Sequence, residues 1–200
     1  MKLQPHPRSP ELEQAIKACL PLLAPWAANV FRMVEAPYAN ERDLLSGAGA
    51  AKYGQRWNPP GIPTAYACLD DALAILEWKQ QRRKAGMSLA PHLPLTQVTI
   101  VAALHRLLDL RQPPVIAALG LPLLPFITEP HQSQIDDAPE LLAQAFGRLA
   151  TQLGVEALIV PAAPDPTRYN LVIYRPNLAA ASILNIHGAE YLPPPRPLAP

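Results

Sequence analysis

The chain has 200 residues, which is close to the length of a single domain and enough to bury a hydrophobic core. Half of the residues (50%) are hydrophobic, but no apolar run is long enough to span a bilayer, so the composition argues against a membrane protein. The formal net charge of +1 excludes the strongly basic surface with which proteins attract nucleic acid.

The N-terminal residues, cysteines and histidines set further expectations. The residues that follow Met1, Lys-Leu-Gln-Pro-His-Pro, do not form an apolar stretch, so we expect no secretory signal and a cytoplasmic protein. Cys19 and Cys68 lie among apolar neighbours, which favours buried thiols over a disulfide framework or a zinc site. The five histidines are scattered without short ligand spacings, and therefore predict no metal site.

The first part of the chain predicts a helix, a strand and a long loop. Residues 11–20 carry acidic residues in the first turn and apolar residues at helical spacing, which indicates a helix. Residues 29–35 alternate as a strand does, with Arg32 in the middle. Residues 38–61 are rich in Gly, Pro and Asn and are typical of a loop.

A short strand and a helix follow this loop. Residues 64–68 form a short run that includes Thr64 and Tyr66 and predicts a strand. Asp70 or Asp71 can then cap a helix that runs to about Ala85, with Gly86 as its C-terminal stop. Glu77 lies on this helix.

The remaining sequence predicts mainly strands, with one further helix. The helix is expected to open at Asp137, with Pro139 in its first turn, and to run to about Leu153. β-Branched and aromatic residues indicate strands at residues 96–102, 155–160, 169–174 and 181–186.

Strands and helices are mixed without a regular βαβ alternation, which predicts an α+β fold. We expect a single compact domain with a mixed, mostly antiparallel sheet flanked by helices. Its divisions are an N-terminal helical extension (residues 1–28), a catalytic domain (residues 29–190) and a Pro-rich tail (residues 191–200). Five of the 26 prolines fall in residues 193–200, which favours a frayed or polyproline II terminus over a docking ligand.

Three consecutive elements bring together a cation, an aromatic ring and a carboxylate. Arg56 lies in a Gly/Pro loop that can present its planar guanidinium to a phosphate. Tyr66 and Glu77 lie on the strand and helix that follow. No basic residue lies three or four positions from Glu77, so its carboxylate either faces water or is kept for chemistry.

Each of these residues also has an ordinary structural interpretation. Arg32 and Arg56 could be surface or ion-pair arginines, and Tyr66 a core aromatic. Asn58, before a proline, favours a turn. Because the chain has no Gly-x-Ser-x-Gly elbow and no histidine close to either cysteine, the arginines, tyrosine and glutamate favour an anionic, nucleotide-like substrate over a hydrolase triad.

The order of these motifs resembles the RES domain family over roughly residues 31–186. The matching segments are residues 31–32, 45–50, 54–61, 65–67, 72–77, 154–161 and 170–174. RES proteins are typically toxins of bacterial toxin–antitoxin pairs, with a fold similar to ADP-ribosyltransferases. They consume NAD by splitting off nicotinamide, with water or phosphate as acceptor, or by passing ADP-ribose to a protein.

The resemblance implies roles for individual residues. Arg56 and Glu77 match the arginine and glutamate of the family name. Glu77 would stabilise positive charge in an oxocarbenium-like transition state, while Arg32 and Arg56 would hold the pyrophosphate. Tyr66 would pack against nicotinamide, and Asn58 belongs to the same binding motif. NAD would be the substrate, with no prosthetic group or metal.

One position departs from the family pattern. The family serine, which the resemblance places in contact with NAD, follows a Val-Pro pair, and here Ala162 takes this binding position after Val160 and Pro161. This predicts weakened catalysis, and leaves open a RES-like module that binds a nucleotide or partner without turnover. A structural interaction domain that uses the Pro-rich tail is a third interpretation. The resemblance further implies a cognate Xre-type antitoxin and self-association into a homo-oligomer.

Overall fold

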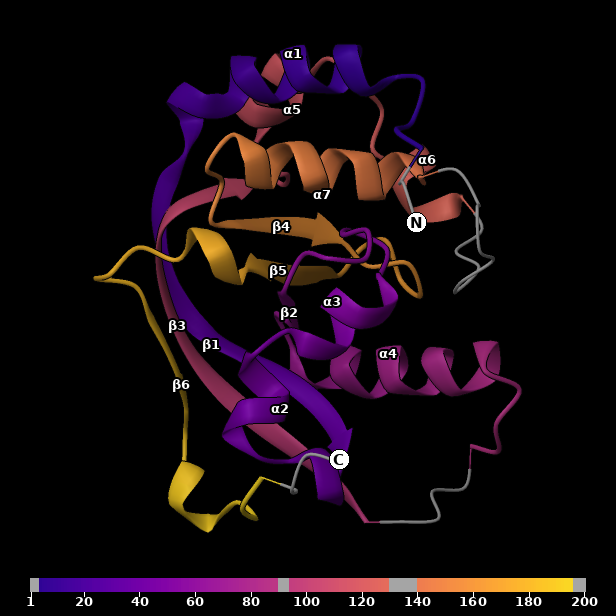
Figure 1. The fold of residues 1–200 in the computed structure, drawn as a ribbon, viewed down its shortest axis with the longest axis vertical. Helices are drawn as coiled ribbons and strands as arrows, with labels where there is room; N and C mark the ends of the chain where they lie inside the picture. Colours follow the sequence, from indigo (N-terminus) through magenta and orange to yellow (C-terminus); the bar gives the residue numbers. More distant parts are fainter. Residues whose placement is uncertain (1–3, 90–93, 130–139, 196–200) are drawn as a thin grey trace.

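A computed structural model describes residues 4–89, 94–129 and 140–195. In this part of the chain, a six-stranded sheet is flanked by helices (Figure 1). The strands are β1 (Ala24–Glu35), β2 (Thr64–Cys68), β3 (Leu95–Asp109), β4 (Ala157–Pro161), β5 (Tyr169–Tyr174) and β6 (Ile183–Ile186).

The α-helices vary from one turn to four. They are α1 (Ser9–Cys19), α2 (Glu41–Leu45), α3 (Ala48–Tyr53), α4 (Asp71–Lys84), α5 (Pro113–Leu119), α6 (Leu124–Thr128) and α7 (Leu142–Gln152). Short 3-10 helices are η1 (Leu20–Leu22), η2 (Ala36–Tyr38), η3 (Arg175–Asn177) and η4 (Ala189–Tyr191). Among the described residues, no helix is long and apolar enough to cross a membrane.

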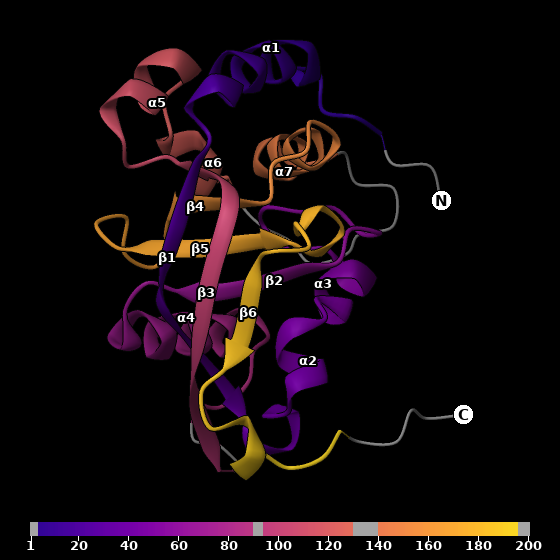
Figure 2. The ribbon, with the colours of Figure 1, turned by 90° about the vertical axis from the view of Figure 1, so that its left-hand side faces the viewer.

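The sheet closes on itself. Its strand order is β1-β2-β5-β4-β3-β6, and β1 also pairs with β3, so the first five strands form a ring of pairings. All pairs are antiparallel except β3–β4. Figure 2 shows the long strands β1 and β3, with β6, crossing the shorter strands β2, β5 and β4. The long strands therefore cover one face of the short strands.

One face of the short strands packs against the long strands. Because side chains alternate along a strand, Ala65 and Ala67 of β2 point to this interior, whereas Tyr66 and Cys68 point to the other face. The interior is filled by small and aliphatic residues of all six strands, together with Leu44 and Leu45 of α2.

The opposite face is covered by two groups of helices. α1, α5 and α7 lie together at one end of the molecule (Figure 1). They bury an apolar core that includes Phe126 and Phe146. α4 packs at the other end, where Leu73 and Ala74 contact Cys68. The space that these two groups leave over β2 is where the candidate site lies.

The predicted α+β class, with a mixed and mostly antiparallel sheet, is confirmed. β5 has the predicted bounds, Tyr169–Tyr174, and α4 begins after Asp70, whose side chain accepts a hydrogen bond from Leu73 N at 2.8 Å. Gly86 adopts a left-handed conformation just after the helix, as expected of a C-terminal stop. Cys19 and Cys68 are buried free thiols.

Other predicted bounds were wrong. Residues 38–61 are not one loop, because they contain α2 and α3, separated by Gly47 at φ 70°. A Cβ at Gly47 would lie 2.3 Å from the backbone nitrogen of Thr64, so this turn requires glycine. β1 and β3 are longer than predicted, and β6 begins two residues later than predicted. α7 begins at Leu142, while the predicted start at Asp137 and Pro139 lies outside the described residues.

The proposed division of the chain stays a prediction. α1 packs on α5 and α7, and its Leu12 and Ile16 are fully buried in the same core as the sheet. The helical extension is therefore in contact with the rest of the molecule.

Candidate active site

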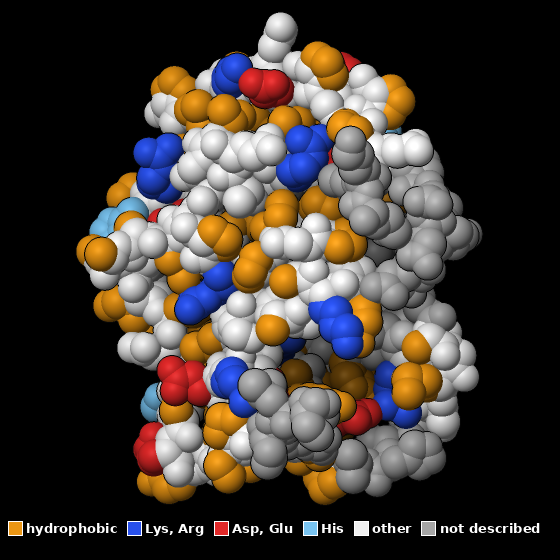
Figure 3. Space-filling model, in the orientation of Figure 1, with side chains coloured by type: hydrophobic (Ala, Val, Ile, Leu, Met, Phe, Trp, Pro, Cys, Tyr) orange, Lys and Arg blue, Asp and Glu red, His pale blue; other side chains and the backbone are white. Residues whose placement is uncertain are grey.

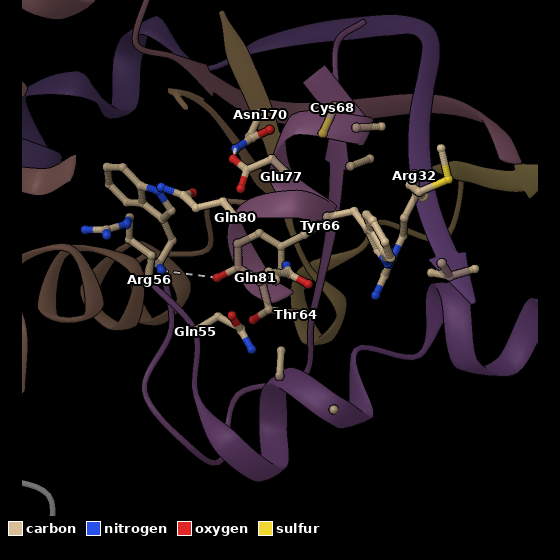
Figure 4. A pocket seen from close by; sticks show the side chains of 18 of the residues that line it. Arg32, Gln55, Arg56, Thr64, Tyr66, Cys68, Glu77, Gln80, Gln81 and Asn170 are labelled. Carbon is tan, nitrogen blue, oxygen red and sulfur yellow. Dashed lines mark hydrogen bonds between the residues drawn. The ribbon is translucent and has the colours of Figure 1, made fainter. Parts of the chain in front are cut away.

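A cavity of about 350 Å³ lies over β2, between β1, α3 and α4. Its lining includes four of the predicted site residues, Arg32, Arg56, Tyr66 and Glu77. In Figure 3 this face is hollowed in its lower half, with apolar side chains at the bottom of the depression. Figure 4 shows Arg56 and Arg32 on opposite sides of Tyr66, with Glu77 above. The cavity thus combines two cations, one carboxylate and an aromatic ring.

The loop that carries Arg56 is fixed at Trp57. The backbone N–H of Trp57 donates to the Tyr66 hydroxyl at 3.1 Å, and its carbonyl accepts from the Tyr174 hydroxyl at 3.1 Å. The indole stacks on Phe126, with ring centroids 5.7 Å apart. Trp57 therefore packs in the core and anchors the residue before it.

Asn58 completes this anchor from inside the protein. It is fully buried, and its Oδ1 accepts a hydrogen bond from the Tyr66 hydroxyl at 2.7 Å. Its Nδ2 donates to the backbone carbonyls of Ala50 in α3 and of Pro59 and Ile62 in the loop. Asn58 does not line the cavity, so the structure gives it the turn-forming role that its position before Pro59 suggested.

The guanidinium of Arg56 is held by backbone carbonyls. Its Nη1 donates to Phe126 at 3.2 Å and to Glu129 at 3.0 Å. Burial lowers the pKa of Arg56, while Glu77 and other nearby groups act in the opposite direction. The group stays charged, because even a lowered arginine pKa lies far above neutral pH. The loop thus presents a fixed positive charge to the cavity.

Arg32 brings the second cation from β1. Its Nη1 donates to the Leu44 carbonyl of α2 at 2.7 Å, and burial lowers its pKa. Because each arginine is tied to backbone, little side-chain freedom is lost when an anion binds.

Glu77 enters the cavity from α4. Its Oε1 accepts a hydrogen bond from Asn170 Nδ2 of β5 at 2.5 Å. Glu77 also interacts electrostatically with Arg56 and with Cys68. Burial raises the pKa of the Cys68 thiol, with Glu77 and Asp70 adding to the effect, so the thiol stays protonated and is a poor nucleophile.

Ala162 lies beneath the site. It is fully buried and packs with Cys68 and α4, whereas its neighbours Pro161 and Ala163 line the cavity. The side chain at position 162 therefore lies between α4 and the sheet, behind the residues that line the cavity. The predicted direct contact of this position with a ligand is not seen in the cavity lining.

Several cavity residues were not predicted from the sequence. Asn170 lay in a matching motif but was assigned no role, and Gln55, Thr64, Gln80 and Gln81 also line the cavity (Figure 4). Gln80 and Gln81 follow Glu77 by three and four positions, and this helical spacing could have predicted that they share its face of α4. Among the described residues, no three His, Cys, Asp or Glu side chains gather as metal ligands do.

The arrangement suits a ligand with both anionic and aromatic parts. Two fixed guanidinium groups can hold phosphate oxygens, and the partly apolar walls with the Tyr66 ring can hold a base. A carboxylate between them can stabilise positive charge that develops on the ligand.

Comparisons with known proteins agree with this chemistry. The profile of the RES domain family matches residues 29–193. NAD(+) phosphorylase MbcT from Mycobacterium bovis and from two strains of Mycobacterium tuberculosis is 31% identical over 145 residues, which cover 69% of either chain. A chain in the crystal structure of the M. tuberculosis MbcT–MbcA toxin–antitoxin complex superposes with a TM-score of 0.65 and 27% identity, over 88% of this chain and 89% of that one.

Proposed function

The chain belongs to the RES domain family, and on that premise we propose that it is a toxin-like enzyme that cleaves the bond between nicotinamide and ribose in NAD. The observation that carries this proposal is the convergence of Arg32, Arg56, Tyr66 and Glu77 on one cavity. These residues lie on β1, on the loop before β2, on β2 itself and on α4, and the fold brings the four side chains to one cavity.

Cleavage breaks the bond between the anomeric carbon of ribose and the nicotinamide nitrogen. Nicotinamide leaves as a neutral molecule with the bonding electron pair, and positive charge develops on the ribose ring. The Glu77 carboxylate stabilises this charge, as carboxylates do in glycosidases. Arg32 and Arg56 hold the pyrophosphate, and the ring of Tyr66 packs against nicotinamide.

An oxygen nucleophile then bonds to the anomeric carbon. We favour inorganic phosphate, because the curated relatives are named NAD(+) phosphorylase. The product would be ADP-ribose 1″-phosphate. Hydrolysis would give ADP-ribose, and transfer to a protein side chain would give a modified protein. These outcomes differ in mass, so the product identifies the acceptor.

The test incubates the purified protein with NAD, with and without phosphate, and follows free nicotinamide and the ribosyl product by mass spectrometry. We expect nicotinamide release by the parent protein, and loss of release in Glu77→Gln. A folded parent protein that releases no nicotinamide with any acceptor would contradict the proposal.

The second candidate is a module that binds NAD or a partner without turnover, and Ala162 in the place of the family serine favours it. Calorimetric binding of NAD by a parent protein that releases no nicotinamide would support this candidate.

We propose a cytoplasmic protein controlled by an Xre-type antitoxin, since the structural neighbour is a toxin in a toxin–antitoxin complex. Co-purification with the product of an adjacent helix-turn-helix gene would test the partner. Light scattering would test the expected homo-oligomer.

A further inference from the structure

We propose that Asn170 is a positioning residue for Glu77, whose carboxylate it orients and holds in the charged form. The inference rests on the proposed function for its catalytic consequence, although the contact can be tested without turnover. Asn170 Nδ2 on β5 donates to Glu77 Oε1 on α4 at 2.5 Å (Figure 4). Such a charge-assisted hydrogen bond is short and favours the ionised carboxylate.

The carbonyl oxygen of the Asn170 amide indicates that the residue has a functional role. Its Oδ1 is buried and has no hydrogen-bond partner among the described residues. A buried acceptor without a partner costs stability. The Asn170 amide therefore donates a hydrogen bond to Glu77 while its own carbonyl oxygen stays without a partner. Such a costly arrangement is typical of a residue retained for function rather than for folding.

Asn177 provides the contrast. Its Nδ2 donates to two backbone carbonyls, Thr151 at 2.7 Å and Val155 at 2.8 Å, and so ties the end of α7 to the segment before β4. It lies outside the cavity lining. Asn177 is thus an asparagine with a structural role, and it serves as the matched control.

The backbone of Asn170 gives the contact its precision. Asn170 pairs with Val160 on β4 and with Cys68 on β2, so it sits in the middle of three hydrogen-bonded strands. A site built on a rigid sheet holds its geometry better than one on a loop.

Asn170 differs from the other groups near Glu77 because it is a neutral hydrogen-bond donor. Arg56 from the loop and Cys68 from β2 interact electrostatically with Glu77, and Asp70 and Arg32 act on the same Cys68 thiol. Arg56 supplies charge that a pyrophosphate would compete for. Asn170 is a neutral donor, so it can hold the carboxylate without cancelling the negative charge that cleavage needs.

The kinetic test compares Asn170→Ala and Asn177→Ala with the parent protein. In Asn170→Ala we expect kcat to fall about tenfold or more, which corresponds to about 1.4 kcal/mol, with a smaller change in KM. The acid limb of the pH–rate profile should move upward by about one pH unit. Asn177→Ala should lower Tm and leave both properties of the folded enzyme unchanged.

A second test does not require enzyme activity. It follows the titration of the Glu77 carboxyl carbon by 13C NMR, and the signal is assigned by its absence from the spectrum of Glu77→Gln. Its titration midpoint should rise by about one pH unit in Asn170→Ala and stay unchanged in Asn177→Ala. Asn170→Leu, which is similar in size, carries no donor and adds no charge, is the second variant if Asn170→Ala does not fold.

The outcomes separate this inference from the proposed function. An inactive parent protein in which the Asn170 variant still shifts the midpoint would overturn NAD cleavage and support the positioning contact. An active parent protein with an unchanged midpoint, kcat and acid limb in the folded Asn170 variant would overturn the positioning role alone.

Discussion

The Tyr66 hydroxyl lies 3.1 Å from the backbone nitrogen of Trp57, so a side chain of β2 fixes the loop that presents Arg56 to the cavity. The same hydroxyl donates to Asn58 Oδ1 at 2.7 Å. The ring of Tyr66 therefore lines the cavity, while its hydroxyl holds the loop that carries Arg56.

Tyr66→Phe should lower stability while keeping the ring. The change leaves the Trp57 N–H and the Asn58 carbonyl without their partner, which costs about 1–3 kcal/mol. A cost of 1 kcal/mol lowers Tm by about 2–4 °C in a chain of this length. Thermal unfolding measures it, with Tyr53→Phe as control, because Tyr53 lines the same cavity but is half-exposed. Equal Tm values for the two variants would show that the hydroxyl does not anchor the loop.

Gly147→Ala should disturb the same loop from its other side. A Cβ on Gly147 of α7 would lie 1.8 Å from the Trp57 carbonyl oxygen and 2.6 Å from the Tyr174 hydroxyl, so backbone must move. We expect a loss of about 1–3 kcal/mol or more, as in overpacked cores.

The matched control is Gly49→Ala on α3. A Cβ there meets nothing within 4 Å, and alanine favours the helix by about 0.5–1 kcal/mol. Denaturant unfolding of both variants tests the close approach, and equal midpoints would refute it.

The sequence predicted part of the fold, and it singled out several residues that line the cavity. β-Branched residues predicted β5, and Asp70 predicted the start of α4. The short helices α2, α3, α5 and α6 were missed, because a helix of five to seven residues depends on tertiary contacts more than on propensity. The role of Asn170 could not be predicted, because only the pairing of β2, β4 and β5 places it against Glu77. The hydroxyl contacts of Tyr66 depend likewise on how the loop folds back.

Ala162→Ser should supply a partner for the buried Asn170 carbonyl. Position 162 lies two residues beyond Val160, which pairs with Asn170, so both side chains lie on one face as diagonal neighbours. A hydroxyl there can donate to Asn170 Oδ1, which adds about 0.5–1.5 kcal/mol of stability. We expect a higher Tm and up to about tenfold faster NAD consumption, since Asn170 becomes better ordered.

Ala163→Ser is the control for this change, because Ala163 lines the cavity, whereas Ala162 packs with Cys68 and α4. A lower Tm for Ala162→Ser would mean that the buried hydroxyl finds no acceptor, and would contradict the predicted contact.

Glu156 should make stability depend on pH. Its fully buried carboxylate accepts hydrogen bonds from the backbone of His105, Arg106 and Ala179 and from the Ser182 hydroxyl. Burial acts to raise the pKa of Glu156, but these hydrogen bonds outweigh it and the pKa is lowered. The folded protein therefore binds this proton less readily than the unfolded chain does.

It follows that the stabilisation by Glu156 is present above its unfolded pKa of about 4.5 and is lost as the pH falls through the lower folded value. The difference in unfolding free energy between the parent protein and Glu156→Gln should be about 1–3 kcal/mol at pH 7 and should shrink below about pH 4.5. Denaturant titrations from about pH 3, below the ordinary glutamate pKa, to about pH 7, where the carboxyl is ionised, check this. A difference that stays constant over this range would refute the assignment.

The most direct test of the account is nicotinamide release from NAD by the parent protein and by Glu77→Gln, measured with phosphate present. The substitution keeps the shape of the side chain and removes the charge that stabilises the transition state. We predict release by the parent protein and a loss of about 100-fold or more in Glu77→Gln, with Tm nearly unchanged. Release at the parental rate by a folded Glu77→Gln protein would contradict the account.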